Sequence, residues 1–290
     1  MDNTKQLKDG KHLITDIKKE YPKLSKGQKL IAQYIMNNYD KVAFMTTSKL
    51  AEEVGVSEST VVRFANVIGF SGYPKFQDAL QELIKNKLTT VQRVDLDEEY
   101  NNEKLVLKKV LKSDIENIRD TIEDIDTKQF EEATNKILKA RKIYILGTRS
   151  SFVIAQYLSF YLNIIMDDVH LIRLDMGDSY EQMIKITEND LVICISFPRY
   201  SKKSYQILSY AKEKGADILS ITDSPFAPVA TLSDNVLLVK SNMVAFVDSL
   251  VPALSLANAL VVSVGMRNKE DIKKRFTDLE SVWDEYSVYQ

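Results

Sequence analysis

Two short stretches of this 290-residue chain combine hydroxyl side chains with an arginine, a mixture that suits the binding of phosphate groups. The first stretch is GVSESTVVRFAN at residues 55–66, and the second is GTRSS at residues 147–151. A related stretch, ISFPRYSK at residues 195–202, repeats this chemistry in a looser form. Because serine and threonine also cap helices in most proteins, the elements around each stretch decide which function it can have.

The segment TSKLAEEVGVSESTVVRFAN, residues 47–66, has the pattern of a helix-turn-helix, in which two short helices flank a turn that contains glycine. We expect the first helix to begin at Ser48, whose hydroxyl can cap it. It should end at Gly55, because the tight turn requires a residue that tolerates positive φ. Ser57 is expected to cap the second helix. The interface between the helices is assigned to Leu50, Ala51, Val54, Val56, Val61 and Phe64.

With Val61 and Phe64 turned inward, the outer side of the second helix carries polar side chains. Hydroxyl and amide groups can contact phosphates or base edges, and arginine can bond guanine in two places. The second helix is therefore predicted to be a recognition helix for the major groove, against the alternative of a capped surface helix in a bundle. The residues predicted to contact DNA are Ser57, Ser59, Thr60, Arg63 and Asn66, with Lys49 and Lys75 as phosphate contacts.

Length and charge favour two domains with different partners. A chain of 290 residues exceeds the about 100–200 residues of a typical domain, and its 44% hydrophobic and 28% charged content indicates a folded globular protein. Residues 1–90 carry 14 Lys and Arg against 10 Asp and Glu, a net charge of +4, whereas the remainder carries 25 against 31, a net charge of −6. This asymmetry favours a polyanion as partner of the first part only.

Other features disfavour several classes of protein. Cys194 is the sole cysteine, so an internal disulfide is excluded, and its place in the apolar run LVICIS favours a buried strand thiol over a nucleophile. We predict no metal site, because His12 and His170 are far apart in the sequence. The apolar run at residues 250–265 is shorter than the about 20 residues of a membrane span and is expected to form a buried helix. We expect a cytoplasmic protein with no cofactor and no membrane partner.

Hydrophobic periodicity predicts a helical bundle with the helix-turn-helix at residues 1–86, a linker at 87–103 and an α/β domain at 104–290. The α/β domain should open with an amphipathic helix at 104–126. Its apolar residues recur at steps of three and four: Leu107, Val110, Leu111, Ile115, Ile118, Ile122 and Ile125. Five apolar runs follow, KIYILG, HLIRLD, DLVICIS, DILSITD and NVLLVK, with helical patterns between them. Their alternation predicts a doubly wound, parallel five-stranded sheet.

Polar side chains follow the first, third and fourth of these runs. In doubly wound sheets, ligands bind beyond the carboxyl ends of the strands, where helix N-termini also attract anions. The fourth run ends at Thr222, Asp223 and Ser224. We therefore predict one shared polar crevice for an anion, against the alternative that these hydroxyls merely cap helices. Its predicted ligand-binding residues are Thr148, Arg149, Ser150, Ser151, Ser196, Arg199 and Ser201.

The run KLAEEVGVSESTVVRFANVIGFSGYPKFQDAL at residues 49–80, together with GTRSS and ISFPRYSK, resembles the RpiR-type transcriptional regulators of bacteria. The resemblance covers nearly the whole chain and implies a helix-turn-helix domain joined to a sugar isomerase (SIS) domain. It implies a regulator whose DNA affinity responds to a phosphorylated sugar, assembled as a homodimer or homotetramer through the SIS domain. We then expect an inverted-repeat operator on double-stranded DNA, because a dimer presents one recognition helix per protomer.

Two features depart from the loops that SIS enzymes often have, a glycine-rich first loop and an S-x-S-G-x-[ST] second loop. Residues 196–201 lack its second serine and its glycine, and Arg149 stands where a small residue is often found. Our hypothesis is that Arg149 and Arg199 replace part of a backbone-amide cradle with bidentate guanidinium contacts.

Two other functions remain open from the sequence. One is a phosphosugar isomerase with an accessory helical domain, which needs a base beside a carbonyl carbon; nothing singles out Glu181 or Asp223 for that role. The other is a structural oligomer in which both polar groups are helix caps, and it predicts binding of neither DNA nor sugar phosphate. We predict the regulator, with no enzymatic activity.

Overall fold

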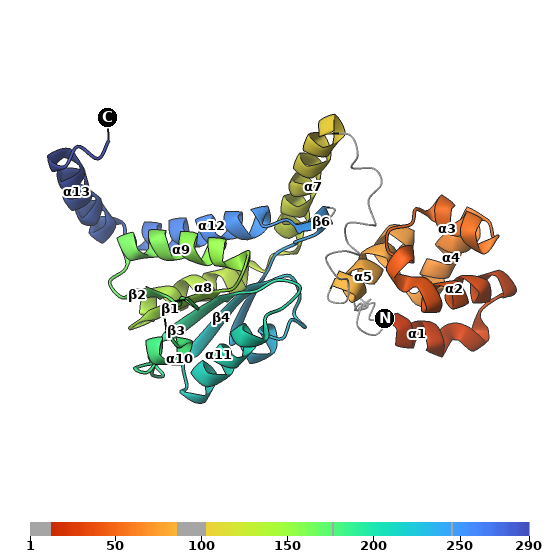
Figure 1. Cartoon of the computed structure of the whole chain (residues 1–290), viewed down its shortest axis with the longest axis horizontal. Coiled ribbons are helices and arrows are strands. Elements are labelled where there is room, and N and C mark those ends of the chain that lie inside the picture. Colours follow the sequence, from red (N-terminus) through yellow and green to blue (C-terminus); the bar gives the residue numbers. More distant parts are fainter. Residues whose placement is uncertain (1–12, 86–102, 176, 245, 290) are drawn as a thin grey trace. The chain divides into compact units, whose positions relative to one another are not determined.

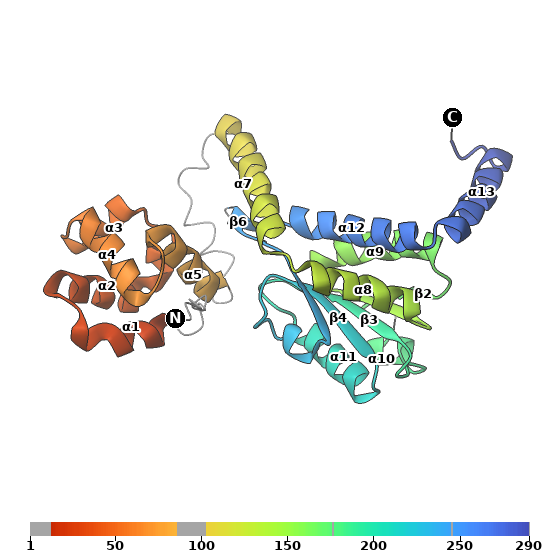
Figure 2. The same ribbon diagram turned by 180° about the vertical axis from the view of Figure 1, so that it is seen from behind.

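The chain forms two compact units, which we call the helical unit and the α/β unit (Figures 1 and 2). The computed structural model describes residues 13–85, 103–175, 177–244 and 246–289. The linker predicted at 87–103 lies almost wholly outside these ranges and stays a prediction. None of the helices in the described ranges combines the length and the apolar character needed to span a bilayer.

The helical unit packs its helices around a cluster of aromatic side chains. Its elements are α1 (Leu13–Glu20), η2 (Tyr21–Lys23), α2 (Lys26–Val42), α3 (Thr47–Val54), α4 (Glu58–Ile68) and α5 (Tyr73–Lys85). The buried ring of Phe76 meets the rings of Phe64 and Phe70 edge-on, with centroids 5.6 and 5.5 Å apart. The Tyr73 hydroxyl donates a hydrogen bond of 2.8 Å to the carbonyl of Met45, which ties α5 to the segment that follows α2.

The helix-turn-helix forms as predicted, with a shifted start. Helix α3 begins at Thr47 rather than Ser48, because the hydroxyl of Thr46 accepts a hydrogen bond of 3.2 Å from the amide of Lys49. Gly55 ends α3 in the left-handed conformation with φ of 71°. Between the helices, Leu50, Ala51, Val61 and Phe64 are buried, while Val54 and Val56 are half-buried.

The α/β unit contains the predicted parallel five-stranded sheet, in the order β2-β1-β3-β4-β5. Its strands are β1 (Ile143–Gly147), β2 (Val169–Leu171), β3 (Leu191–Ile195), β4 (Asp217–Thr222) and β5 (Asn235–Leu238), and a hairpin of β6 (Met243–Val244) and β7 (Val247–Asp248) follows. The helices are α7 (Glu103–Asp124), α8 (Thr127–Lys139), α9 (Ser151–Ile165), α10 (Ser179–Gln182), α11 (Lys202–Glu213), η4 (Ala230–Leu232), α12 (Val251–Arg267) and α13 (Lys269–Glu285). Each predicted apolar run therefore supplies one strand.

Helices cover both faces of the sheet, as a doubly wound fold requires. Helices α8, α9 and α12 pack on one face, and α10 and α11 lie on the other (Figure 1). Side chains alternate along each strand, so that Ile143 and Ile145 enter the first core and Tyr144 and Leu146 the second. Cys194 is fully buried in the second core, where burial raises the pKa of its thiol; the predicted strand thiol is confirmed.

Two helices, α12 and α7, expose apolar side chains that the sequence pattern predicts to be covered. Helix α12 buries one side through Leu256, Leu260 and Val264, but Val262 and Met266 on its other side are exposed, so the predicted buried helix is only half right.

Helix α7 leaves much of its predicted apolar stripe uncovered, because polar groups attach its other side to the unit; Val110 and Ile118 of that stripe are half-buried. Asn117 pairs with Asn242, accepting from its amide at 3.0 Å and donating to its carbonyl at 3.3 Å. Thr121 accepts from the amide of Lys240 at 2.9 Å, and Ser249 donates to Asp114 at 2.6 Å. The apolar stripe of α7 is left in solvent at Leu107, Leu111, Ile115 and Ile122.

Candidate functional sites

Helix α4 presents the predicted DNA-contacting side chains at its surface. Ser57, Ser59, Arg63 and Asn66 are exposed, but Thr60 is half-buried rather than turned fully outward. The difference arises because Thr60 lies beside the start of α2: a Cβ added to Gly27 would come 3.3 Å from Cγ2 of Thr60.

The polar groups at the start of α4 are bonded to one another. The hydroxyl of Ser57 lies 2.9 Å from that of Ser59 and 2.8 Å from that of Thr60. Arg63 donates from Nε to the carbonyl of Ser59 at 3.1 Å and from Nη2 to its hydroxyl at 3.0 Å. Ser57 stands at the N-cap position, yet it makes no capping bond, so that part of the prediction is wrong. Exposed hydrogen bonds of this kind exchange at little net cost for bonds to a polar partner.

The cations of the helical unit differ in how they are paired. Lys49 lies 3.3 Å from both Glu52 and Glu53, and hydrogen bonds to Glu52 and then Glu53 raise the pKa of its ammonium group. Lys75 lies 3.5 Å from Asp78 in one exposed pair. Exposed pairs contribute little stability, so both lysines can still contact phosphate.

Lys26 is an exposed cation that the sequence did not single out. It begins α2, next to the Gly27 that approaches Thr60, and therefore lies near the start of α4. The signal that could have drawn attention to it is the capping box that Ser25 forms with Gln28, which marks a helix start.

In the α/β unit, the sheet order locates the predicted crevice. The chain passes from β1 to β2 on one side and then to β3 on the other, so that the topological switch point lies between β1 and β3. In doubly wound sheets, ligands bind at this point, beyond the carboxyl ends of the strands. Helices α9 and α11 begin just after these strands, so their N-termini supply partial positive charge at the same edge.

The loop after β1 is held close to helix α9. A Cβ added to Gly147 would come 2.5 Å from the carbonyl oxygen of Ser151 and 2.8 Å from Cβ of Ala155, so that only glycine fits. Arg149 adopts φ of 53°, in the left-handed region that side chains rarely enter. Arg149 and Ser150 are exposed, whereas Ser151 is buried and Ser150, at the N-cap, makes no capping bond.

Side-chain hydrogen bonds join the three predicted loops. The hydroxyls of Thr148, after β1, and Ser204, in the first turn of α11, lie 3.3 Å apart. The hydroxyl of Ser201 accepts from the amide of Ser204 at 3.3 Å and caps α11. The hydroxyl of Tyr200 donates to Asp223, after β4, at 2.8 Å. The loops that follow β1, β3 and β4 thus meet at one edge.

Two of the joining residues, Tyr200 and Ser204, were missed from the sequence. Ser204 is fully buried and lies three residues after its N-cap, a position that also suits an ordinary helix residue. Of the predicted residues after β3, Ser196 is buried, with its amide bonded to the carbonyl of Ile221 at 3.1 Å, and Arg199 is exposed.

The groups that an isomerase could use as a base have other bonds. Glu181 accepts from the amide of Asp178 at 3.4 Å and so completes the capping box of α10. Asp223 accepts from Tyr200, as described above. His170 lies on the edge strand β2 and is bonded to Asp168.

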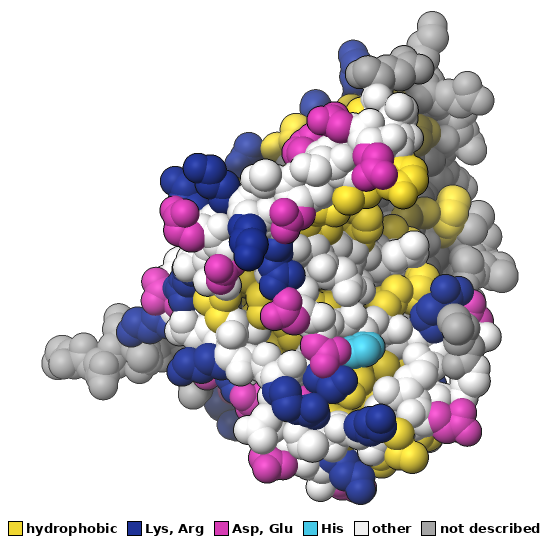
Figure 3. All heavy atoms as spheres, turned by 90° about the vertical axis from the view of Figure 1, so that its left-hand side faces the viewer, with side chains coloured by type: hydrophobic (Ala, Val, Ile, Leu, Met, Phe, Trp, Pro, Cys, Tyr) yellow, Lys and Arg dark blue, Asp and Glu magenta, His cyan; other side chains and the backbone are white. Residues whose placement is uncertain are grey.

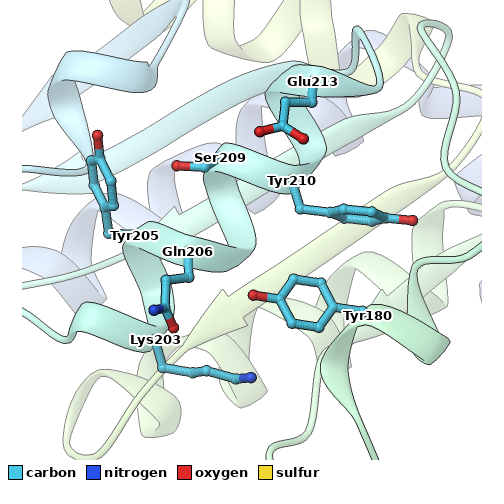
Figure 4. A pocket seen from close by; sticks show the side chains of 7 residues that line it. All are labelled: Tyr180, Lys203, Tyr205, Gln206, Ser209, Tyr210 and Glu213. Carbon is cyan, nitrogen blue, oxygen red and sulfur yellow. The ribbon is translucent and has the colours of Figure 1, made fainter.

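A separate open pocket of about 500 Å³ lies on the outer side of α11 (Figure 4). Tyr180, from α10, meets Tyr210 edge-on with centroids 5.2 Å apart, and the ammonium of Lys203 lies 4.7 Å from the centre of the Tyr180 ring. The pocket shares no residue with the predicted crevice. The anion site predicted at the strand ends differs from this pocket in having two helix N-termini, those of α9 and α11, beside it.

Both units match known domains. Residues 11–87 match the helix-turn-helix domain of the rpiR family, and residues 136–263 match the SIS domain. An uncharacterized HTH-type transcriptional regulator of Haemophilus influenzae is 30% identical over 232 residues, which cover 78% of this chain and 79% of the relative. One from Clostridium perfringens is 28% identical over 252 residues, covering 83% and 88%.

The fold has a solved counterpart in the NanR protein of Vibrio vulnificus complexed with ManNAc-6P. It is 22% identical with a TM-score of 0.57, and the match covers 94% of this chain and 98% of that one. The fold and the two matched domains define a class, the helix-turn-helix transcriptional regulators that carry a SIS domain. Within that class, this chain belongs to the RpiR family, which confirms the resemblance seen in its motifs.

Proposed function

We propose that this regulator binds operator DNA through α4 and a phosphorylated sugar at the carboxyl edge of β1 and β3, and that the sugar alters its affinity for the operator. One observation carries the ligand site. The hydroxyls of Thr148 and Ser204 lie 3.3 Å apart, which joins the loops at the N-termini of two helices.

The chemistry of this edge suits a phosphate with hydroxyls attached. Helix N-termini and serine hydroxyls stabilise phosphate oxygens, and Arg149 and Arg199 are exposed on the same two loops. The sugar complex of the NanR counterpart supports the same class of ligand for this chain. The other proposed ligand contacts are Thr148, Ser150, Ser151, Ser196 and Ser201.

On DNA, the exposed side of α4 would enter the major groove. Arg63, one turn beyond the hydroxyl cluster, is the proposed reader of a guanine, and Asn66 lies on the next turn. Lys75 and Lys26 are proposed phosphate contacts. We further propose a homodimer and an inverted-repeat operator, because one recognition helix per protomer then meets one half-site.

The proposal includes no enzymatic turnover. Isomerisation requires a base placed beside the reacting carbon, and Glu181 and Asp223 already serve in a helix cap and in a loop-to-loop hydrogen bond. A sensor needs binding only, with a coupling between ligand and DNA of about 1–3 kcal/mol.

The test is fluorescence anisotropy with labelled DNA from upstream of the protein's own gene and with a scrambled copy, at fixed salt. Each titration is repeated with a panel of sugar phosphates. We expect a preference for the upstream DNA that one sugar phosphate shifts about 5- to 150-fold. Conversion of any sugar phosphate, followed by NMR, would replace the sensor with the isomerase; binding of neither DNA nor sugar phosphate would favour the structural oligomer.

A further inference from the structure

Helix α13 carries an apolar stripe that its own unit covers only at its first turn. The stripe consists of Ile272, Phe276, Leu279, Val282, Trp283 and Tyr286. No residue of α13 is buried, and Tyr286 is 70% exposed. Its first turns are attached to the unit through Ile272, which packs on the core, and through an ion pair between Arg275 and Asp167. A two-sided helix of this kind normally covers its apolar side against another element.

Helix α7 also carries an apolar stripe that its own unit leaves largely exposed. Its polar side holds it to the unit through Asn117 and Thr121, and much of its apolar stripe is exposed, with Leu107 65% exposed and Ile122 69% exposed. Apolar stripes of this length on monomeric proteins mark interaction surfaces.

Within one copy, these two stripes lie at opposite ends of the same helix. α12 contacts α7 near its start and continues into α13 at its end (Figures 1 and 2). α12 has 17 residues, so the two attachment points are separated by about 25 Å. The stripe of α7 therefore cannot cover the stripe of α13 in its own chain.

The charges beside the two stripes are complementary. On α7, Lys108 and Lys112 are exposed one turn apart beside Leu107 and Leu111. On α13, Glu280 and Asp284 are exposed one turn apart beside the stripe, and residues 276–289 contain four acidic residues and no lysine or arginine. Opposite charges that flank two apolar stripes select partner and orientation when helices pack together.

The surface between the two helices is also apolar. Val262 and Met266 are exposed along α12, and Val153 and Phe160 are exposed on α9, which packs against it. Seen from the α13 end, hydrophobic side chains emerge in patches between charges of both signs (Figure 3). An interface that begins at α7 and ends at α13 would therefore be continuous.

From these features we infer that α13 of one copy packs against α7 of a second copy, and that the reverse contact forms at the same time in a two-fold dimer. Lys108 and Lys112 of each copy face Glu280 and Asp284 of the other. The two-fold axis makes every contact occur twice, so that both exposed stripes of both copies are covered. This contact needs neither DNA nor sugar phosphate, and it can fail while the proposed function stands.

Sedimentation velocity on the full chain tests the charge pairing. We expect the parent to be dimeric at micromolar concentration. The double variants Lys108→Glu/Lys112→Glu and Glu280→Lys/Asp284→Lys should each weaken the dimer about 10-fold or more, because attraction becomes repulsion at exposed sites where neither changes the fold. Combining all four substitutions should bring the dissociation constant back to within about 3-fold of the parent. Glu131→Lys/Glu132→Lys on α8 is the control with the same change of charge as the α13 double variant.

A monomeric parent, double variants that dimerise like the parent, or a fourfold variant that does not recover would each overturn the inference.

Cross-linking through introduced cysteines gives an independent test. The native Cys194 is buried and should not react with the cross-linker. Two differently tagged chains, one with Leu107→Cys and one with Phe276→Cys, are mixed and treated with a short bis-maleimide. A product that carries both tags is expected; products only between identical variants would show a different interface.

Discussion

The turn between α3 and α4 and the turn between β1 and α9 contain almost the same residue types, a glycine followed by hydroxyls and an arginine. Their structures differ. Gly55 adopts φ of 71°, and a Cβ added there would meet no atom within 4 Å. A Cβ added to Gly147 would lie only 2.5 Å from the carbonyl oxygen of Ser151. After the first turn, the hydroxyls of Ser57 and Ser59 are exposed along one helix; after the second, the hydroxyl of Thr148 bonds to that of the buried Ser204 on another element.

The difference between the two turns corresponds to two kinds of phosphate-containing partner, a nucleic acid and a small ligand. An exposed helix surface matches a long partner that lies outside the protein, such as a duplex. A crowded strand end, with amides and hydroxyls converging, matches a small ligand that enters the protein's edge. Composition alone does not distinguish these cases, because the position of the glycine relative to its neighbours sets which one forms.

The largest expected effect is from Gly147→Ala. Its new Cβ would overlap the carbonyl of Ser151 and the side chain of Ala155, so that strand β1 and helix α9 must separate. We expect a loss of about 3 kcal/mol in the free energy of unfolding, measured by urea denaturation. Gly265→Ala on α12 is the control, since its Cβ meets only the flexible end of Ile272. An equal effect of both variants would show that the β1 turn is not crowded.

Arg63→Ala should give the next largest effect, on DNA. Loss of a bidentate contact to guanine should lower the preference for operator over scrambled DNA by about 10- to 100-fold, with scrambled DNA bound nearly as before. Competition anisotropy at fixed salt measures both affinities. The matched control is Arg63→Lys, which keeps the charge but not the fork of donors. If Arg63→Ala weakened both DNAs alike, α4 would not be reading bases.

In the α/β unit, Arg149→Ala and Arg199→Ala should each weaken sugar-phosphate binding about 10-fold, since each removes a charge-assisted hydrogen bond. Isothermal titration calorimetry with the sugar phosphate that shifts DNA binding measures this effect, and operator affinity without sugar should not change. Arg149→Lys should recover only part of the loss. Parent-like responses from both alanine variants would show that the guanidinium groups do not replace the backbone-amide cradle.

A structural feature could be predicted from this sequence when the residues that form it lie within one short segment. The five strands could be predicted because strands buried on both faces have continuous apolar runs. The helix-turn-helix could be predicted because Gly55 and the flanking apolar residues lie within one short segment. The approach of Thr148 to Ser204 could not, since those residues are 56 positions apart and meet only because β1 and β3 are neighbours.

Helix α7 shows a second limit. Periodicity grouped Leu107, Leu111 and Ile115 on one side correctly, but it could not say which side faces the unit. Asn117 and Thr121, each bonded to backbone more than 100 residues away, decide that question. A pattern of apolar residues therefore predicts a covered surface, and the covering element can belong to another copy of the chain.

Gly55→Ala should have a smaller effect than Gly147→Ala. Its Cβ meets nothing within 4 Å, so the cost is only that of the left-handed backbone, about 1 kcal/mol in the free energy of unfolding. Asn tolerates this conformation better, and Gly55→Asn should recover about half of the loss. Thermal unfolding of the three proteins measures the series. A larger loss for Gly55→Ala than for Gly147→Ala would reverse the comparison between the two turns.

The smallest expected effect distinguishes the two lysines predicted to contact phosphate. Lys75→Ala should weaken operator and scrambled DNA alike and reduce the slope of log affinity against log salt by about one. Lys49→Ala should change the slope less, because Glu52 and Glu53 on its own helix already neutralise that ammonium, whereas Lys75 faces a single carboxylate. Salt titrations of both variants and of Lys19→Ala, an exposed lysine on α1, give the three slopes. Equal slopes for Lys49→Ala and Lys75→Ala would mean that DNA displaces both acidic partners, and that pairing in the free protein does not select which lysines meet the phosphates.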